Sequence, residues 1–115
     1  MQIRNYLEAP FEQKTIHDGE GLIRSRKLFG ADDFASGLRY VARTELPPGA
    51  SIGEHGHRDA REELYVILSG TGTFQLDGQT RRVGPGDILL TRAGSTHGLV
   101  NDGTETLDVF VVWAL

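Results

Sequence analysis

Residues 64–83 read LYVILSGTGTFQLDGQTRRV, and this stretch decides the fold class. Residues 64–68 form a short apolar run rich in β-branched and aromatic side chains, which is typical of a buried strand. Asp77-Gly78 separates two further strand-like runs, and this dipeptide favours the hairpin turn in which both central residues take positive φ. The stretch therefore predicts three strands, the last two paired as a hairpin.

The flanking sequence continues the same pattern. Residues 38–46 alternate, so that Leu38, Tyr40, Ala42, Thr44 and Leu46 share one expected face. Pro47-Pro48-Gly49 ends this run, and further short strands are expected over residues 88–90, 97–100 and 107–115. Short strands with a turn every eight to twelve residues or so are typical of a sandwich or barrel. We predict a single all-β domain, built as a closed or double-sheet barrel that limits exposed strand edges.

Composition excludes several classes of function. The 115 residues carry a net charge of −4 and no basic block, which argues against a nucleic-acid partner. The absence of cysteine excludes disulfides and thiolate metal sites. Residues 1–5 lack the apolar core of a secretory signal, and the longest apolar run, residues 109–115, is too short to cross a bilayer. A cytoplasmic protein with no membrane partner is expected.

Three of the four histidines lie in two short segments. His55 and His57 are two residues apart, so on a strand both imidazoles point to the same face. Glu63 begins the next strand after a polar loop, and a hairpin there would return its carboxylate beside the two rings. His97 lies on a later strand.

Three imidazoles and one carboxylate predict a site for one divalent transition metal: manganese, iron, cobalt, nickel, copper or zinc. A five- or six-coordinate ion would keep open positions, as catalysis needs. A four-coordinate zinc would be closed and structural.

The spacing around these residues resembles the two motifs of the cupin superfamily. The first runs from Gly49 through His55, His57 and Glu63 to Gly70, and the second comprises Gly86, Arg92, Gly94, His97 and Asn101. The resemblance implies a double-stranded β-helix, or jelly-roll barrel, over residues 38–115. It also implies that His55, His57, Glu63 and His97 bind the metal. Residues 1–37 would then be an N-terminal extension whose strands pack on the barrel or on a partner subunit.

The chain departs from the cupin pattern at two places. The loop after His57 is longer than usual, so Glu62 has the usual distance from His57 whereas Glu63 has the usual distance to Gly70. We prefer Glu63, because the strand that follows fixes the register and loops absorb insertions. Arg92 stands where the family usually has proline, and we expect a solvated surface residue there.

Residues near the motifs invite simpler interpretations. His17 is expected to be a plain surface residue, and Asn101 to cap a turn. Arg58 and Arg61 are expected to be solvated, although either could meet an anionic ligand. Aromatic and apolar side chains of the strands are expected to fill the barrel: Tyr65, Phe74, Phe110 and Trp113, with Leu64, Val66, Leu76, Leu89 and Val111 or their neighbours.

Two functions follow from the resemblance. One is a metal-dependent enzyme acting on a small, oxygen-rich, anionic molecule bound in the barrel, with the reaction left open among dioxygenase, decarboxylase, isomerase, lyase and cyclase. Glu62, Tyr40 or Tyr65 could then act as a base. The alternative is a non-catalytic binding or sensor protein with a structural metal. Family resemblance also implies a homodimer, with the N-terminal segment or the apolar last strand at the contact.

Overall fold

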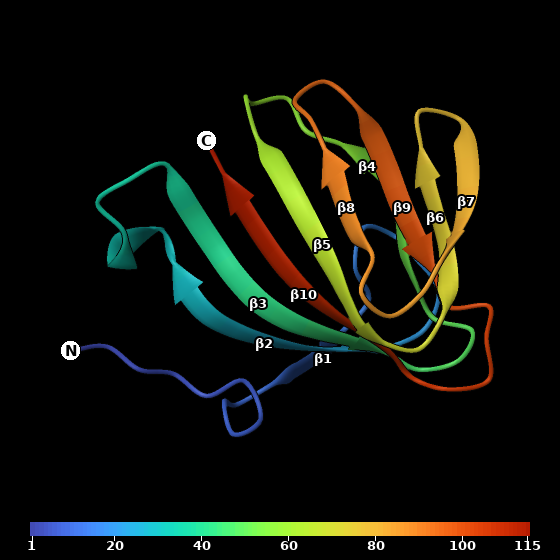
Figure 1. Ribbon diagram of the computed structural model, residues 1–115, viewed down its shortest axis with the longest axis horizontal. Helices are drawn as coiled ribbons and strands as arrows, with labels where there is room; N and C mark the ends of the chain where they lie inside the picture. The colour runs from blue at the N-terminus through green and yellow to red at the C-terminus, as the bar shows by residue number, and fades with distance from the viewer.

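Two antiparallel sheets face each other in the computed structural model, which describes residues 1–115 (Figure 1). The larger sheet runs, in spatial order, β1 (Glu12–Lys14), β2 (Ile23–Gly30), β3 (Leu38–Leu46), β10 (Leu107–Ala114), β5 (Glu62–Ser69) and β8 (Ile88–Thr91). The smaller sheet runs β4 (Ser51–Gly56), β9 (Thr96–Val100), β6 (Gly72–Leu76) and β7 (Gln79–Val83). The all-β jelly-roll prediction is confirmed.

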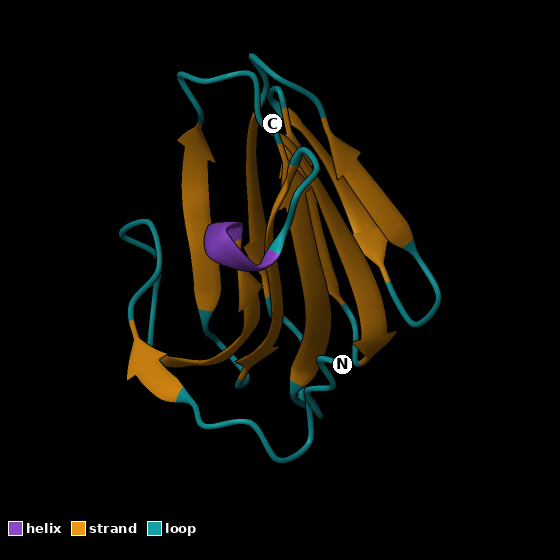
Figure 2. Ribbon diagram, turned by 90° about the vertical axis from the view of Figure 1, so that its left-hand side faces the viewer, coloured by secondary structure: helices purple, strands orange, loops and turns teal.

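Helical structure is confined to one short 3-10 turn, η1 (Ala31–Asp33), between β2 and β3 (Figure 2). No helix is long and apolar enough to cross a membrane.

The Asp77-Gly78 turn joins β6 and β7 as the sequence predicts. Asp77 and Gly78 take φ values of 49° and 80°, and Leu76 pairs with Gln79 across the turn. The Asp77 carboxylate also accepts a hydrogen bond of 2.9 Å from the backbone N–H of Thr96. The hairpin is thereby tied to the start of β9, the strand that carries His97.

Alternate residues of each strand fill the space between the sheets. Tyr65 and Ile67 on β5 are buried, whereas Leu64 and Leu68 point outward and are 37% and 38% exposed. The interior was expected to be lined by Leu64 and Val66 or their neighbours; the neighbours Tyr65 and Ile67 line it, whereas Leu64 and Val66 lie on the outward face. Because successive side chains of a strand alternate in direction, the inward position of Tyr65 also turns Glu63 inward.

The N-terminal residues are built into the barrel rather than loosely attached to it. β2 pairs with β3 in the larger sheet, and the Tyr6 ring packs edge-on against Phe110 on the outer face of β10, with 5.9 Å between ring centroids. The apolar outer face of the last strand is thus partly covered by the chain itself.

Residues 16–20 run along the start of β4. The Gly53 N–H donates to the Ile16 carbonyl oxygen at 3.1 Å, and the Ser51 N–H donates to the Glu20 carbonyl oxygen at 2.9 Å. A Cβ on Gly53 would overlap the carbonyl oxygen of His17, so glycine is required for this close approach. Docking of this segment brings His17 to the His55 end of β4.

Candidate metal centre

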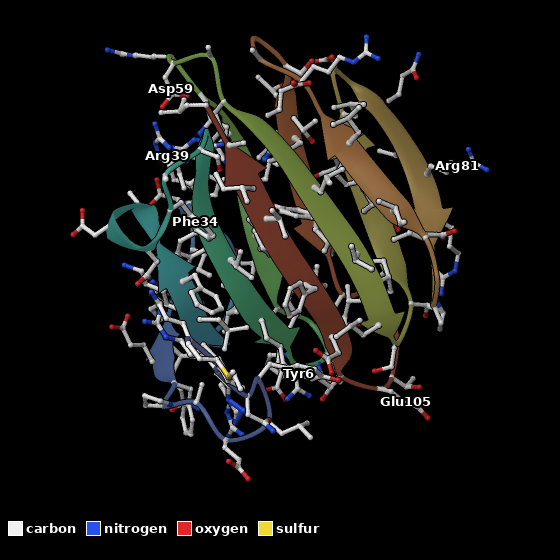
Figure 3. All side chains as sticks on the ribbon, turned by 60° about the vertical axis from the view of Figure 1, so that its left-hand side comes forward. Tyr6, Phe34, Arg39, Asp59, Arg81 and Glu105 are labelled. Atoms are coloured by element: carbon white, nitrogen blue, oxygen red, sulfur yellow. The ribbon has the colours of Figure 1, made fainter.

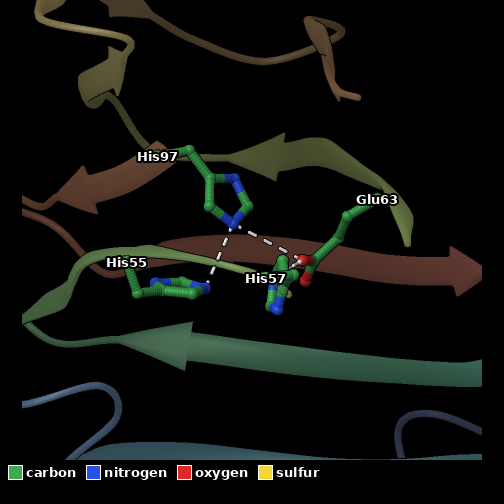
Figure 4. Close-up of side chains that lie close together, drawn as sticks. All are labelled: His55, His57, Glu63 and His97. Atoms are coloured by element: carbon green, nitrogen blue, oxygen red, sulfur yellow. Dashed lines mark hydrogen bonds and ion pairs between the residues drawn. The ribbon is translucent and has the colours of Figure 1, made fainter. Parts of the chain in front are cut away.

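The four predicted metal-binding side chains come from both sheets and meet at one end of the barrel (Figure 4). His55 on β4 lies opposite His97 on β9 in the register of the smaller sheet. His57 follows the end of β4, and Glu63 reaches across from β5 in the larger sheet. One ligand atom from each of the four residues lies within 4.8 Å of the others.

The donor atoms converge closely. His97 Nε2 lies 3.2 Å from His55 Nε2 and 3.4 Å from Glu63 Oε2. His57 Nε2 lies 3.1 Å from the same Glu63 oxygen. The His97 side chain is fully buried, and those of His57 and Glu63 are nearly so.

Hydrogen bonds at the far ring nitrogens fix which nitrogen of two histidines faces the centre. His55 Nδ1 lies 2.7 Å from the Gly53 carbonyl oxygen, which only accepts, so Nδ1 carries the proton and donates it. His97 Nδ1 lies 2.7 Å from the Thr91 hydroxyl oxygen, which can accept the Nδ1 proton or donate its own proton to Nδ1. In the tautomer whose Nδ1 donates to Thr91, His97 Nε2 can bind a cation together with His55 Nε2, 3.2 Å away.

Electrostatics favours a neutral ring at His55 and an ionised carboxylate at Glu63. Burial, with the nearby imidazoles, lowers the pKa of His55 to about 4, so its ring is neutral at pH 7. Burial would raise the pKa of Glu63, but the hydrogen bonds and charges of His97 and His57 outweigh it and lower that pKa overall. Neutral imidazoles and an ionised carboxylate are the forms that bind metal.

The structure places Glu63, and not Glu62, at the histidines. Glu63 is 8% exposed and inside the barrel, whereas Glu62 is exposed on the opposite face of β5. The loop after His57 is one residue longer than usual, and the register of β5 still places Glu63 inside the barrel.

The chemistry of this donor set fits a divalent transition metal. Three imidazoles with one carboxylate suit manganese, iron, cobalt, nickel, copper or zinc better than calcium or magnesium, which prefer oxygen ligands throughout. The second contact of His97, from Thr91, is the kind of outer hydrogen bond that orients a metal-binding imidazole.

His17 was missed by sequence reasoning. It is exposed, as expected of a surface residue, but its ring stacks on that of His55 with centroids 3.4 Å apart and planes 12° apart. Burial beside His57 lowers the pKa of His17. His17 therefore covers the outer side of the candidate site. Gly19 is the one nearby residue in the sequence that could have indicated this docking, because a side chain there would collide with the backbone of β4.

A cavity of about 190 Å³ opens beside His57 and Glu63. Its wall includes Trp113 and Arg61, so Trp113 borders the cavity rather than simply filling the core. The remaining lining residues are Lys14, Ile16, His17, Ser25, Tyr40, Thr44, Ile52, Tyr65 and Val111. Glu62 and Arg58 are not among them.

A larger hollow of about 450 Å³ lies elsewhere, between the β6–β7 hairpin and β8. It touches none of the four clustered residues. We place the functional site at the smaller cavity, because only there do buried polar groups converge.

Comparison with known proteins now decides the family. Residues 42–113 match the cupin domain family, and both motifs lie within that span. This chain is a cupin. The matched region lies inside the barrel expected for residues 38–115, while the boundary at residue 38 stays a prediction.

Similar proteins cover almost the whole cupin chain. An oxalate-binding protein from Thermotoga maritima is 30% identical over 112 residues, which span 97% of this chain and 92% of that protein. The solved structure of a predicted oxalate decarboxylase from Thermotoga maritima has 30% identity and a TM-score of 0.94, with 99% of each chain covered. The polyketide cyclase RemF from Streptomyces resistomycificus has 26% identity and a TM-score of 0.81, covering 99% of this chain and 78% of that one.

Proposed function

We propose that this cupin holds one divalent transition metal with His55, His57, Glu63 and His97, and uses it to bind and transform a small oxygen-rich anion. The observation that carries the proposal is the convergence of three imidazoles and one ionised carboxylate at the edge of a cavity. Such a set leaves coordination positions for a ligand on a five- or six-coordinate ion.

Charge and volume point to a short carboxylate. A divalent ion beside one glutamate leaves a net charge of about +1, which favours an anion. The cavity of about 190 Å³ is smaller than the pockets that usually hold drug-sized ligands, so it suits a small molecule. The curated relative and the solved structure from Thermotoga maritima both carry names that mention oxalate, which is a molecule of this kind. Oxalate is therefore the first ligand to test.

When bound, the ion would supply Lewis acidity that polarises a coordinated carboxylate or carbonyl. The protein supplies the cavity walls and titratable side chains such as Tyr65 and Tyr40. Tyr65 is fully buried beside Glu63, and burial with that negative charge raises its pKa well above the usual value. Tyr65 therefore keeps its proton and does not serve as a base, whereas Tyr40 remains a candidate at the cavity wall.

A second candidate function is binding without catalysis. It is favoured by the name of the oxalate-binding relative, and because Glu62, one of the three expected bases, lies outside the cavity. In this case the metal would anchor the anion and no bond would break.

Elemental analysis followed by calorimetry tests the proposal. We expect about one equivalent of a divalent transition metal per chain, loss of that metal in His55→Ala, and retention in Arg92→Ala, which changes an exposed residue. The loaded protein should bind oxalate. Release of formate or carbon dioxide from oxalate would separate an enzyme from a binding protein. Wild-type protein that takes up no transition metal when offered one would overturn the proposal.

We also propose a homodimer formed through the outer face of β5 and β8. Leu64 and Leu68 on β5 and Ile88 and Leu90 on β8 are between 37% and 65% exposed, and β5 pairs with β8 in the larger sheet. A contiguous exposed apolar face of this kind marks an interaction surface. We expect Ile88→Asp to yield monomers by light scattering, while Leu22→Asp, also at an exposed leucine, leaves the dimer intact. A monomeric wild type would contradict this proposal.

A further inference from the structure

Arg61 places a cationic group at the wall of the metal-side cavity. Its guanidinium carbon lies 3.6 Å from the ring centroid of Trp113, and both side chains line the cavity together with His57 and Glu63. The Arg61 side chain is only 23% exposed, although it comes from the loop between β4 and β5. Stacking on an aromatic face holds a guanidinium in a fixed plane.

The hydrogen bonding of Arg61 is incomplete. One terminal nitrogen, Nη2, lies 3.3 Å from Asp59 Oδ2, and Nε is buried without a partner. A guanidinium has five N–H donors arranged to meet a carboxylate with two parallel bonds. An unsatisfied buried donor costs free energy, so a ligand that supplied the missing acceptor would be favoured.

Arg43 is a fully paired structural arginine. Its Nε and Nη2 bind both oxygens of Asp108, at 2.9 and 2.7 Å, on neighbouring strands of the larger sheet. Neither Arg43 nor Arg26, which also has a buried Nε without a partner, borders the cavity as Arg61 does. The guanidinium of Arg61 makes only one hydrogen bond to a side chain, a long one from Nη2 to Asp59 Oδ2. Asp59 itself is exposed on the loop (Figure 3).

The other cation at the cavity is less suited to a buried ligand. The Lys14 side chain is 48% exposed and its ammonium lies 3.5 Å from Glu12. Arg61 is thus the more buried of the two cationic side chains that line the cavity.

We propose that Arg61 binds a carboxylate of the ligand through the fork that Asp59 occupies only loosely, so that the site selects a short dicarboxylate over a monocarboxylate. This inference rests on the proposed function, in which the metal holds one end of the anion. The metal with Glu63 contributes about +1 and Arg61 another positive charge, which together match a dianion. Binding of the ligand displaces the Asp59 side chain from Arg61.

Oxalate and glyoxylate test the proposal, because they have the same carbon skeleton and differ in the second carboxylate. The protein is loaded with Mn²⁺, its metal content is measured, and both dissociation constants are determined by calorimetry. We expect Arg61→Gln to weaken oxalate binding about 10- to 100-fold. Glyoxylate binding should change by less than about threefold.

Two further variants sharpen the test. Asp59→Asn keeps the side-chain oxygen that accepts from the backbone N–H of Arg61. It removes the negative charge that competes with oxalate for the guanidinium, so it should tighten oxalate binding. Arg58→Gln removes an exposed arginine of the same loop and should leave both affinities unchanged. Trp113, the single tryptophan, gives a second readout: oxalate should shift its fluorescence in the wild type and not in Arg61→Gln.

The outcomes distinguish this inference from the proposed function. Oxalate binding that Arg61→Gln leaves at the wild-type level, with equal metal content, would overturn the role of Arg61 alone. Equal affinity of the wild type for oxalate and glyoxylate would also overturn it. A wild-type protein that holds Mn²⁺ but binds neither anion would overturn the proposed function and the inference with it.

Discussion

His97 and Asn101 are two fully buried polar residues at opposite ends of β9, and they differ in how completely they are hydrogen-bonded. Asn101 Nδ2 donates to the carbonyl oxygens of Leu46 and Glu105, both at 2.8 Å, and its Oδ1 accepts from the Gly103 N–H at 3.0 Å. His97 has one satisfied nitrogen, bound to Thr91, and one that faces other metal-binding atoms.

Complete hydrogen bonding separates a structural buried polar group from one that can bind a ligand. A side chain whose donors and acceptors are all paired stabilises the fold and has nothing left to offer a ligand. A buried nitrogen that faces a second imidazole nitrogen and a carboxylate is placed to bind a cation together with them. Asn101 therefore closes one end of the barrel, and His97 helps to form a site at the other.

The largest expected effect is loss of metal from His97→Ala. Removal of one of four ligands should weaken metal binding by more than about 100-fold, beyond what loss of an outer contact costs. Added metal should raise the melting temperature of the wild type, since it binds only the folded state, and should not raise that of the variant. Scanning calorimetry with and without metal measures both. An equal upward shift in the variant would remove His97 from the site.

Asn101→Ala should produce the next largest effect, on stability instead of metal binding. It leaves two carbonyl oxygens and one N–H without their partner, for a loss of about 3 kcal/mol in the free energy of unfolding. Urea denaturation of the metal-free protein measures it. Asn101→Asp places a carboxylate oxygen against the same two carbonyl oxygens, so it should destabilise the protein at least as much as Asn101→Ala. If the folded Asn101→Ala protein lost its metal affinity, the conclusion that Asn101 is structural and takes no part in the metal site would be wrong.

A smaller effect is expected from Thr91→Val, which removes the hydroxyl that is hydrogen-bonded to His97 Nδ1 while keeping a similar shape. Metal affinity should fall about 10- to 100-fold, as for other outer partners of metal-binding histidines. Thr91→Ser keeps the hydroxyl and should stay close to the wild type. Competition with a metal chelator gives both affinities. Equal affinities for the valine and serine variants would show that this hydrogen bond does not orient the ring.

The smallest effect is expected from Glu62→Gln, beside a large one from Glu63→Gln. Glu62 is exposed outside the barrel, so its change should alter metal affinity by less than about twofold. Glu63→Gln removes the only carboxylate of the cluster and should lower the affinity at least about tenfold. The same competition measurement serves for both. If Glu62→Gln lowered metal affinity more than Glu63→Gln does, the register of β5 would differ from the one described.

Local sequence determined the strands and the candidate ligand set. The alternation over residues 38–46 and the Asp77-Gly78 turn set strand boundaries, because side-chain direction and positive φ are properties of neighbouring residues. The spacing of the cupin motifs brought Glu63 and the histidines into one hypothesis, and the structure gathers them. The role of Asn101 at a turn was also predictable, since asparagine side chains bond to nearby backbone.

The residues that surround the candidate ligands depend on long-range contacts that the sequence does not reveal. Nothing near His17 in the sequence shows that it stacks on His55, because that contact requires residues 16–20 to dock along β4. Arg61 and Trp113 are 52 positions apart and meet because β5 and β10 are neighbours, with Glu63 opposite Trp113 in their register. Strand periodicity tells which way a side chain points, whereas the partner it meets depends on long-range strand pairing.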